Sequence, residues 1–351
     1  MILSDSRLGF IFKDKAPLNH NFKIENVLYR SCDTTWTQPW GEVKDIRNRY
    51  NEMTVRLQEK HAPHRKMDVI FRAFDDGIGF RYELPQQAAL DSFQITDELT
   101  EFNLTEDPRC WWIGAYQRNR YEYLFQETRL HDIDTVHTPF TMETDDGLCL
   151  SIHEANLTDY SSMSLARYDS TGLTCDLCPW SDGTKVKART PMVTPWRTMQ
   201  IAEKPGDLIT SYLILNLNEP SKIKDTSWIK PQKYIGIWWE MHIGKSTWGS
   251  GENHGATTAN AEKYIDFAAK YGFDGVLVEG WNVDWDGDWV QNGSIFNFTK
   301  PHPDYDIEEV GRELKAGLIL ETGLLVEGDK IRVNSRLIDS HDQSIIWAYP
   351  Y

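Results

Sequence analysis

The residues best suited to chemistry lie in the segment 273–282, Phe-Asp-Gly-Val-Leu-Val-Glu-Gly-Trp-Asn. Its apolar run, Val276–Val278, follows a turn signal and is typical of a buried parallel strand. In a (β/α)₈ barrel the carboxyl ends of the strands face the active site, so Glu279 and Trp281 would lie there. A carboxylate beside a flat aromatic ring suits a sugar. The alternative is a solvated strand end, and the spacing alone supports both interpretations equally.

Composition limits the classes of protein to consider. With 351 residues, 40% of them apolar, the chain can bury one large core or two, so we expect two domains. The formal charge of −16 argues against a nucleic-acid partner, and there is no polybasic patch for a membrane surface. No apolar run reaches the roughly 18 residues of a membrane-spanning helix. The first residues also lack the apolar core of a signal peptide. We therefore expect a soluble chain without an export signal.

The cysteines give no metal or redox signature. There are five, an odd number, and Cys175 and Cys178 form a lone C-x-x-C. No second pair stands at the spacing of a zinc site, so we expect structural thiols.

Residues 1–228 have the pattern of an all-β domain. Short β-rich segments alternate with turn residues, which favours a large antiparallel sandwich. Asp145-Asp146-Gly147 predicts a hairpin between Phe140–Thr144 and Leu148–Ile152. Residues 218–233 are polar, contain two prolines and predict a linker. The other expected strands are Thr54–Gln58, Met67–Phe71, Gly79–Leu84 and Leu208–Leu217.

After the linker the pattern changes to α/β. Tyr234–Trp239 predicts an apolar strand, and Thr257–Tyr271 predicts a helix with one buried face that Gly272 ends. Gly275–Val278 is the next expected strand. Strand, helix and strand in this order form a βαβ unit, whose crossover should be right-handed.

Long motifs along the chain resemble one protein family. They are Ser6-Arg-Leu-Gly-Phe10, Trp36-Thr-Gln-Pro-Trp-Gly41, Phe71-Arg-Ala-Phe-Asp-Asp-Gly-Ile-Gly-Phe-Arg-Tyr-Glu83, His153-Glu-Ala-Asn-Leu-Thr-Asp-Tyr160, Thr194-Pro-Trp-Arg197, Tyr234-Ile-Gly-Ile-Trp-Trp-Glu-Met241, His254-Gly-Ala-Thr-Thr258 and the segment 273–282. Between about residues 6 and 310 the chain resembles glycoside hydrolase family 97, bacterial exo-α-glycosidases that act on α-glucosides or α-galactosides. The resemblance implies a multidomain β plus α/β fold, with a β-supersandwich over residues 1–228 and then a (β/α)₈ catalytic barrel.

The resemblance also implies a calcium ion at the sugar site. Glu154, in the His153-Glu-Ala-Asn motif, would be its ligand from the sandwich. Calcium takes six to eight oxygen ligands, so this carboxylate would be one part of the site. The implied partner is an α-linked oligosaccharide, with Glu279 in contact with the sugar. For the parent family the implied location is periplasmic or secreted.

Four further side chains suit the wall of such a site, because apolar faces with polar edges fit a sugar ring. They are Trp238, Trp239, His242 and Trp281. Side chains alternate along a strand, so we expect one of Trp238 and Trp239 to be barrel core instead. A structural role for His242 is nearly as well supported as a site role.

Glycoside hydrolysis needs two carboxyl groups across the scissile bond. In the resembled family they lie on barrel strands later than the one that ends at Glu279, and this sequence has no counterpart of them. A whole barrel takes about 250 residues, many more than the segment 229–310. We therefore expect an incomplete barrel there and a chain that is inactive alone.

After Val310 the sequence departs from the family pattern. From about residue 306 it resembles a small TolB-like domain, the segment Asp306–Val310 fitting either pattern, and we expect residues 311–351 to form a short αβ tail. Leu318–Val326 and Lys330–Ile338 flank Glu327-Gly328-Asp329, which predicts a hairpin. The chain would then be a chimera or a truncated gene product. Three functions stay open: part of an α-glycosidase, a non-catalytic carbohydrate-binding β-sandwich module, or a gene fusion without function.

Overall fold

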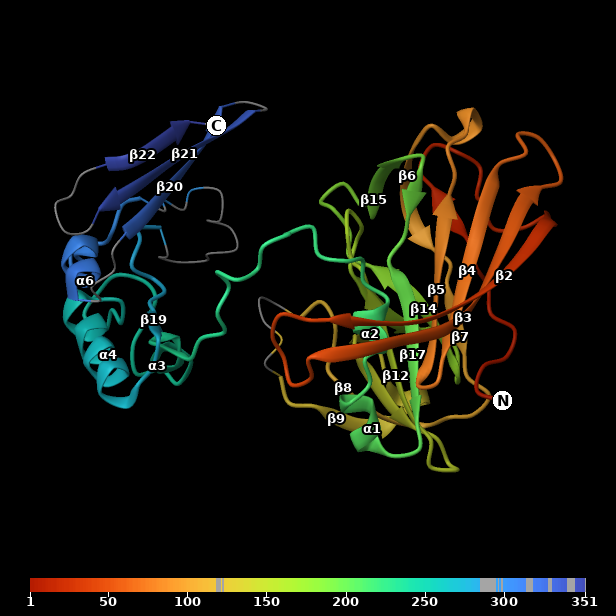
Figure 1. Cartoon of the computed structure of the whole chain (residues 1–351), viewed down its shortest axis with the longest axis horizontal. Helices are drawn as coiled ribbons and strands as arrows, with labels where there is room; N and C mark the ends of the chain where they lie inside the picture. The colour runs from red at the N-terminus through yellow and green to blue at the C-terminus, as the bar shows by residue number, and fades with distance from the viewer. Residues whose placement is uncertain are drawn as a thin grey trace. The chain divides into compact units, whose positions relative to one another are not determined.

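The computed structural model describes residues 1–117, 121, 123–284, 295, 297, 299–313, 318–327, 330–339 and 345–350. These residues form two compact units, Met1–Thr226 and Ser227–Tyr351 (Figure 1). The division between the units falls inside the segment 218–233, which the sequence predicts to be a linker. Within the described ranges, no helix is both long and apolar enough to cross a membrane.

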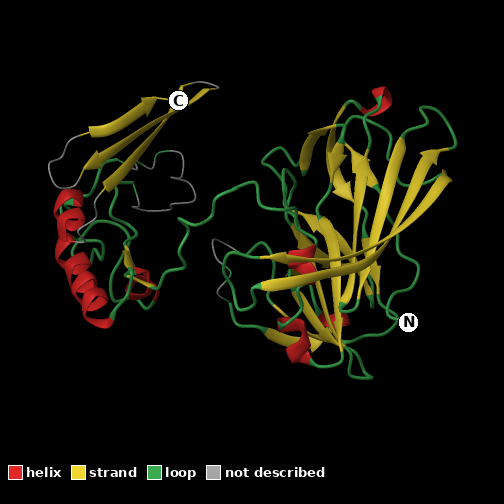
Figure 2. Cartoon of the chain, viewed as in Figure 1, coloured by secondary structure: helices red, strands yellow, loops and turns green. Residues whose placement is uncertain are grey.

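The regular secondary structure of the first unit consists almost wholly of strands (Figure 2). They are β1 (Phe10–Phe12), β2 (Phe22–Thr37), β3 (Asp45–Glu59), β4 (Lys66–Phe74), β5 (Gly77–Leu84), β6 (Ser92–Glu98), β7 (Glu101–Asn103), β8 (Arg109–Trp112), β9 (Gln126–Arg129), β10 (Thr135–His137), β11 (Phe140–Glu143), β12 (Cys149–Ala155), β13 (Met163–Arg167), β14 (Gly172–Leu177), β15 (Val186–Arg189), β16 (Met192–Val193) and β17 (Trp196–Ala202). Two short helices, α1 (Pro205–Ile209) and α2 (Leu213–Asn216), follow them.

Three sheets share one apolar core. The described strands form a ten-stranded sheet in the order β2-β3-β4-β5-β17-β12-β11-β8-β9, with β16 beside β5. A four-stranded sheet, β10-β13-β14-β7, and a three-stranded sheet, β1-β6-β15, complete the unit. Tyr82 and Ile152 of the large sheet are fully buried in the same cluster as Leu165 and Ile95 of the two smaller sheets. The expectation of an N-terminal β domain is therefore confirmed.

The predicted hairpin of this unit is present, but one predicted strand is wrong. β11 pairs with β12 from Phe140↔Ile152 to Glu143↔Cys149, as the turn signal between them requires. Leu208–Leu217, by contrast, contains the end of α1 and all of α2. Pro205 sets the helical φ at the start of α1. Leu213 and Leu217 lie four residues apart, so both can be buried on one helical face against Trp196.

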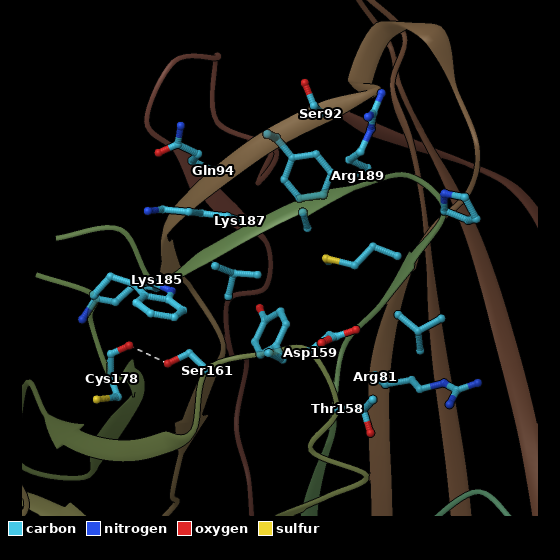
Figure 3. Close-up of a pocket in the computed structure, with 18 of the residues that line it drawn as sticks. Arg81, Ser92, Gln94, Thr158, Asp159, Ser161, Cys178, Lys185, Lys187 and Arg189 are labelled. Atoms are coloured by element: carbon cyan, nitrogen blue, oxygen red, sulfur yellow. Dashed lines mark hydrogen bonds between the residues drawn. The ribbon is translucent and has the colours of Figure 1, made fainter. Parts of the chain in front are cut away.

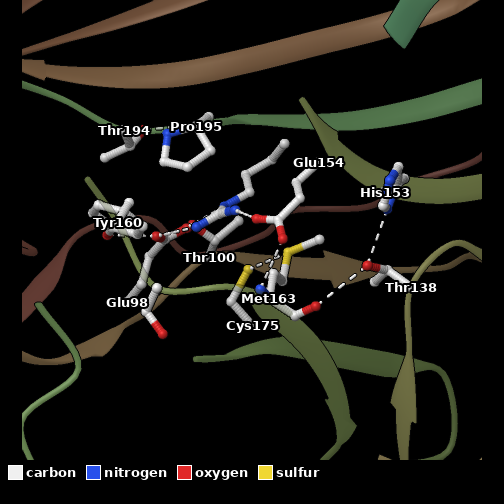
Figure 4. A network of polar contacts seen from close by, with 12 residues as sticks. Glu98, Thr100, Thr138, His153, Glu154, Tyr160, Met163, Cys175, Thr194 and Pro195 are labelled. Atoms are coloured by element: carbon white, nitrogen blue, oxygen red, sulfur yellow. Dashed lines mark hydrogen bonds and ion pairs between the residues drawn. The ribbon is translucent and has the colours of Figure 1, made fainter. Parts of the chain in front are cut away.

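A fully buried arginine connects the large sheet to the three-stranded sheet. The Arg197 side chain, on β17, donates from Nε and Nη2 to the two oxygens of Glu98 at the end of β6, at 2.8 and 2.7 Å. Its Nη1 donates to Oε2 of Glu154 on β12, at 2.7 Å. The hydroxyls of Tyr160 and Thr100 also donate to Glu98, each at 2.8 Å. Figure 4 shows Glu98, Glu154, Tyr160 and Thr100 gathered in this network.

The two carboxyl groups of this network differ in their acidity. Burial alone would raise the pKa of Glu98, but the charge of Arg197 and the hydrogen bonds from Arg197, Tyr160 and Thr100 lower it. Burial raises the pKa of Glu154, and Arg197 offsets only part of that effect. Glu98 is therefore the carboxylate that balances the arginine charge.

The second unit begins with a parallel βαβ arrangement. β18 (Tyr234–Gly236) and β19 (Gly275–Leu277) pair in parallel, in register from Tyr234↔Gly275 to Gly236↔Leu277. Between them lie α3 (Trp238–His242) and α4 (Thr258–Tyr271). The side chain of Thr257 caps α4 by accepting a hydrogen bond from the Asn260 amide, and Gly272 ends the helix at φ 73°. The predicted helix and the order of its flanking strands are confirmed.

The remaining elements of the second unit are α6 (Ile307–Glu313), β20 (Leu318–Glu327), β21 (Lys330–Asp339) and β22 (Ile345–Pro350). β20 and β21 pair antiparallel from Leu318↔Asp339 to Glu327↔Lys330, as the predicted hairpin requires. β22 pairs with the other edge of β21. The predicted turn residues Gly328 and Asp329 lie outside the described residues.

Replacing Glu98 by Gln should lower the free energy of unfolding of the first unit by about 3–5 kcal/mol, because Arg197 would lose its two-oxygen partner inside the core. Glu154→Gln is the matched control and should cost clearly less, since the charged form of Glu154 is disfavoured there. Urea denaturation followed by near-ultraviolet circular dichroism measures both variants. Equal losses of stability would contradict this assignment of the charges.

Candidate functional site

The segment that carries Glu279 begins directly after β19 and is held in a tight bend. Gly280 has a φ of 80°, in the left-handed region that favours glycine. A Cβ atom at this position would lie 2.8 Å from the carbonyl oxygen of Trp248, closer than a side chain can approach. Glycine at 280 therefore lets the Trp248 loop approach the end of β19.

This approach brings an indole against the candidate carboxylate. Nε1 of Trp248 donates to Oε2 of Glu279 at 3.2 Å. The Trp248 ring meets the ring of His242 edge to face, with centroids 5.0 Å apart. Trp248 thus connects the carboxylate after β19 to the aromatic side chains after β18. Sequence reasoning missed Trp248, because it lies in an irregular loop where no periodicity marks it.

The aromatic side chains predicted for the wall form one cluster. The ring centroids of Trp238 and His242 are 4.8 Å apart, and those of Trp238 and Trp239 are 5.3 Å apart. Trp238 and Trp281 both pack against the buried cluster of Ile237 and its neighbours, whereas Trp239 is 57% exposed. The described structure therefore places Trp239 toward solvent and Trp238 against the core.

The predicted strand Tyr234–Trp239 is wrong in its second half. β18 ends at Gly236, and Trp238–His242 is the helix α3. Trp238 and Trp239 are consequently separated by the helical rotation and not by strand alternation. Residues four apart lie on the same helical face, which explains why Trp238 contacts His242.

Trp281 lies on the inner side of this site. It is half-buried, and its ring centroid is 6.0 Å from that of Tyr305, with the planes tilted by 34°. It packs against the cluster of Ala261 and Ile265 on α4 as well as that of Ile237. Much of its surface therefore supports the fold, and the remaining exposed part is what a ligand could reach.

A buried histidine fixes the backbone between Glu279 and Trp281. His254 has a side chain that is 1% exposed. Its Nε2 lies 2.9 Å from the carbonyl oxygen of Gly280, and its Nδ1 lies 2.8 Å from Oδ2 of Asp304. Both partner atoms are acceptors, so the ring holds both only when both of its nitrogens donate. Sequence reasoning did not identify His254 or Asp304 as site residues, although His254 begins one of the family motifs.

One nearby carboxylate is committed to the fold. Glu240 on α3 accepts hydrogen bonds from Lys245 at 2.8 Å, Tyr264 at 3.0 Å and Asn260 at 3.3 Å. Burial opposes the charged form, but these donors outweigh it and lower the pKa of Glu240. Glu240 therefore ties α3 to α4 and stays ionised.

Comparison with known proteins identifies the family. The family model described as Glycosyl-hydrolase 97 N-terminal matches residues 1–220, and the model Glycoside hydrolase 97 matches residues 238–316. The chain belongs to glycoside hydrolase family 97. A retaining alpha-galactosidase from Bacteroides thetaiotaomicron is 24% identical over an alignment of 324 positions, which covers 83% of this chain and 47% of that protein.

Solved structures of family 97 enzymes agree with this assignment. An enzyme from Pseudoalteromonas sp. strain K8, in complex with panose, has a TM-score of 0.82 at 52% identity over 90% of this chain and 48% of that chain. Its complex with acarbose has a TM-score of 0.81 at 51% identity, over 89% of this chain and 48% of that chain. The chain spans about half the length of the relatives that it matches.

Membership in family 97 fits calcium dependence at the level of the family, but the residues around Glu154 do not fit the ion as they are arranged. One oxygen of this carboxylate accepts from the Met163 amide at 3.0 Å, and the other accepts from Arg197 at 2.7 Å. A guanidinium at contact distance repels a second cation. Within the described residues, no group of three or more His, Cys, Asp or Glu side chains is placed to hold a metal. Calcium ligation by Glu154 stays a prediction that would require it to leave Arg197.

The melting temperature of the chain should therefore be the same with calcium and with a chelator. A bound ligand stabilises the folded state in proportion to the logarithm of its concentration over its Kd, so an occupied site would shift the transition. Differential scanning calorimetry at several calcium concentrations measures this. A rise with calcium that Glu154→Gln abolishes would establish Glu154 as a ligand.

Replacing His254 by Ala should loosen the segment 279–283 without unfolding the unit. The variant loses the hydrogen bond to Gly280 and leaves that carbonyl unpaired, so amide exchange in this segment should speed up about tenfold. Hydrogen-exchange mass spectrometry measures it, with the exposed His61→Ala as the control. Unchanged exchange at 279–283 would show that the bend is held by Gly280 alone.

Proposed function

We propose that this chain contributes the N-terminal domain and the first part of the sugar site of an α-glycosidase that releases terminal sugars from α-linked oligosaccharides. The observation that carries the proposal is the contact between Glu279 and Trp248 at the carboxyl end of β19. A half-buried carboxylate, an indole and the rings of Trp238 and His242 meet there. Such a group of apolar faces with polar edges suits a pyranose ring.

The names of the relatives support an α-linked saccharide as the substrate class. The Pseudoalteromonas enzyme was solved with panose and with acarbose. The Bacteroides relative is a retaining alpha-galactosidase. By the same resemblance we propose a periplasmic or secreted location for the parent protein.

At the level of the fold, we propose that residues 229–310 are the beginning of a (β/α)₈ barrel. The parallel pair β18 and β19, connected through α4, supports this. Leu277, in the middle of the apolar run, is 38% exposed, because β19 pairs with β18 alone within the described residues. For residues 311–351 we propose a TolB-like αβ tail, and the antiparallel sheet β20-β21-β22 supports it.

Each residue of the site has a role that follows from its contacts. Glu279 accepts hydrogen bonds from sugar hydroxyls, and Trp248 orients it through Nε1. Trp239, which is 57% exposed, presents an apolar face to the sugar. His254 holds the backbone between Glu279 and Trp281 in place.

We expect this chain to bind saccharides but not to hydrolyse them. Hydrolysis requires an acid and a base or nucleophile on opposite sides of the scissile bond. We propose that the later barrel strands, which carry these groups in the family, have no counterpart in the 351 residues. Calcium, where the family binds it, would supply a positive charge beside the sugar. We therefore propose that the chain binds α-linked saccharides without turning them over.

Glu279→Gln should weaken binding of panose to the chain by about tenfold, because hydrogen bonds to a charged acceptor are worth roughly 1.5–3 kcal/mol. It should leave the hydrolysis of an aryl α-glucoside at the background rate, the same as for the unmodified chain. Isothermal titration calorimetry measures the first effect and release of the aryl group the second. Glu252→Gln, an exposed carboxylate of the same unit, is the control.

Two outcomes would contradict the proposal. Robust hydrolysis by the purified chain would show that the acid and base are present after all. Panose binding that is equally strong in the unmodified chain and in Glu279→Gln would place the sugar elsewhere.

A further inference from the structure

The first unit contains a large cleft that lies entirely within the β-sandwich domain. Its volume is about 1480 Å³. It is lined by the strands β6 and β15, by the loop 156–161 and by the loop 178–180 (Figure 3). Small-ligand pockets usually measure about 300–1,000 Å³, so an oligosaccharide of several rings has room here. The cleft shares no residue with the Glu279 site.

An exposed indole stands at the edge of this cleft. Trp180 is 63% exposed, although the sequence places it in a domain with a large aromatic core. Its backbone is fixed in a tight turn, because the Trp180 amide donates to the Thr184 carbonyl at 2.8 Å and the Gly183 amide donates to the Trp180 carbonyl at 2.9 Å. The Lys187 ammonium lies 5.6 Å from the ring centroid. The indole is therefore held out by its own turn and oriented by a neighbouring cation.

Several polar side chains around the cleft have hydrogen-bonding groups that a ligand could use. Within the described part of the chain, several of its polar side chains make no hydrogen bond or ion pair with protein: Asp14, Lys15, Ser92, Thr158, Asp159 and Lys222. Asn156 and Asp159 both have positive φ, at 55° and 48°. Backbone in this region costs energy outside glycine and gathers at functional loops. The loop 156–161 thus holds hydroxyl and carboxylate groups toward the cleft in a fixed conformation.

The charges of the cleft favour a neutral ligand. Six basic side chains line it, and four of them are paired: Lys187 with Asp182 at 3.0 Å, Arg189 with Asp91 at 3.0 Å, Lys185 with Asp176 at 3.3 Å and Arg81 with Glu83 at 2.6 Å. An anion at these four side chains would have to compete with the carboxylates, and the two remaining lysines, Lys15 and Lys222, are matched in number by the carboxylates of Asp14 and Asp159. A hydroxyl-rich, uncharged molecule uses the free donors and acceptors without that competition.

We propose that this cleft is a second saccharide-binding site, in which a neutral oligosaccharide packs a sugar face on Trp180 and donates to and accepts from the side chains of the loop 156–161. An aromatic platform with polar groups around it is the chemistry that a pyranose ring requires. The choice of an α-linked ligand rests on the proposed function. The location of the site does not, because it depends only on the first unit.

The test uses the full 351-residue chain with panose, by hydrogen-exchange mass spectrometry and by isothermal titration calorimetry. Panose should slow exchange in the peptides that cover 156–161 and 178–189. This protection should persist in Glu279→Gln and disappear in Trp180→Ala, with affinity for the cleft falling about tenfold or more. Trp40→Ala removes an indole that is 46% exposed and outside the cleft, so it should change nothing.

The peptides that panose protects distinguish a failure of the second site from a failure of the proposed function. Protection at 156–161 and 178–189 without protection at 273–284 would support the second site and contradict the proposed function. Protection at 273–284 alone would do the opposite. Panose binding that Trp180→Ala leaves unchanged, or an absence of panose binding, would overturn the second site. Trp180→Phe keeps an aromatic face and should retain most of the affinity.

Discussion

One buried charge holds the N-terminal domain together. Arg197 is fully enclosed, and a guanidinium can be desolvated in this way only if carboxylates and hydroxyls replace the water around it. Glu98 meets it with both oxygens from the three-stranded sheet, and Glu154 meets it from the neighbouring strand of the large sheet. The apolar side chains of the core would pack over a range of relative positions of the sheets. The hydrogen bonds of Arg197 to Glu98 and Glu154 form at only one of these positions. The same hydrogen bonds fix β12 and therefore the start of the loop that follows it.

That constraint bears on ligand binding, because the loop 156–161 begins two residues after Glu154 and contains Tyr160, which donates to Glu98. One wall of the cleft beside Trp180 is therefore the loop 156–161, which the ion-pair network holds. The other wall is formed by the strands β6 and β15. In the second unit a buried histidine has the same effect: His254 holds the Gly280 carbonyl, and the bend at Gly280 places Glu279 against Trp248. In each unit, a buried side chain holds a polar loop in place: Arg197 in the first and His254 in the second.

The organisation of the chain could be predicted from its sequence. Alternating strands before residue 218, the turn signal at Asp145-Asp146-Gly147 and the capped helix Thr257–Tyr271 are local signals, and local backbone preferences decide them. The family could also be predicted from the sequence, since its motifs are long and occur in order. The errors arose where short apolar runs fit either a strand or a helix. Leu208–Leu217 and the second half of Tyr234–Trp239 became helical because packing against Trp196 and Ile237 favoured it.

By itself, therefore, the sequence determined the two-part architecture, the family and the identity of the carboxylate and rings after β18 and β19. Only the tertiary structure decided which of these groups meet. The contact of Trp248 with Glu279, the hold of His254 on Gly280 and the pairing of Glu154 with Arg197 join residues 26 to 43 positions apart. No periodicity or turn preference extends over such distances, because these contacts depend on how whole elements pack.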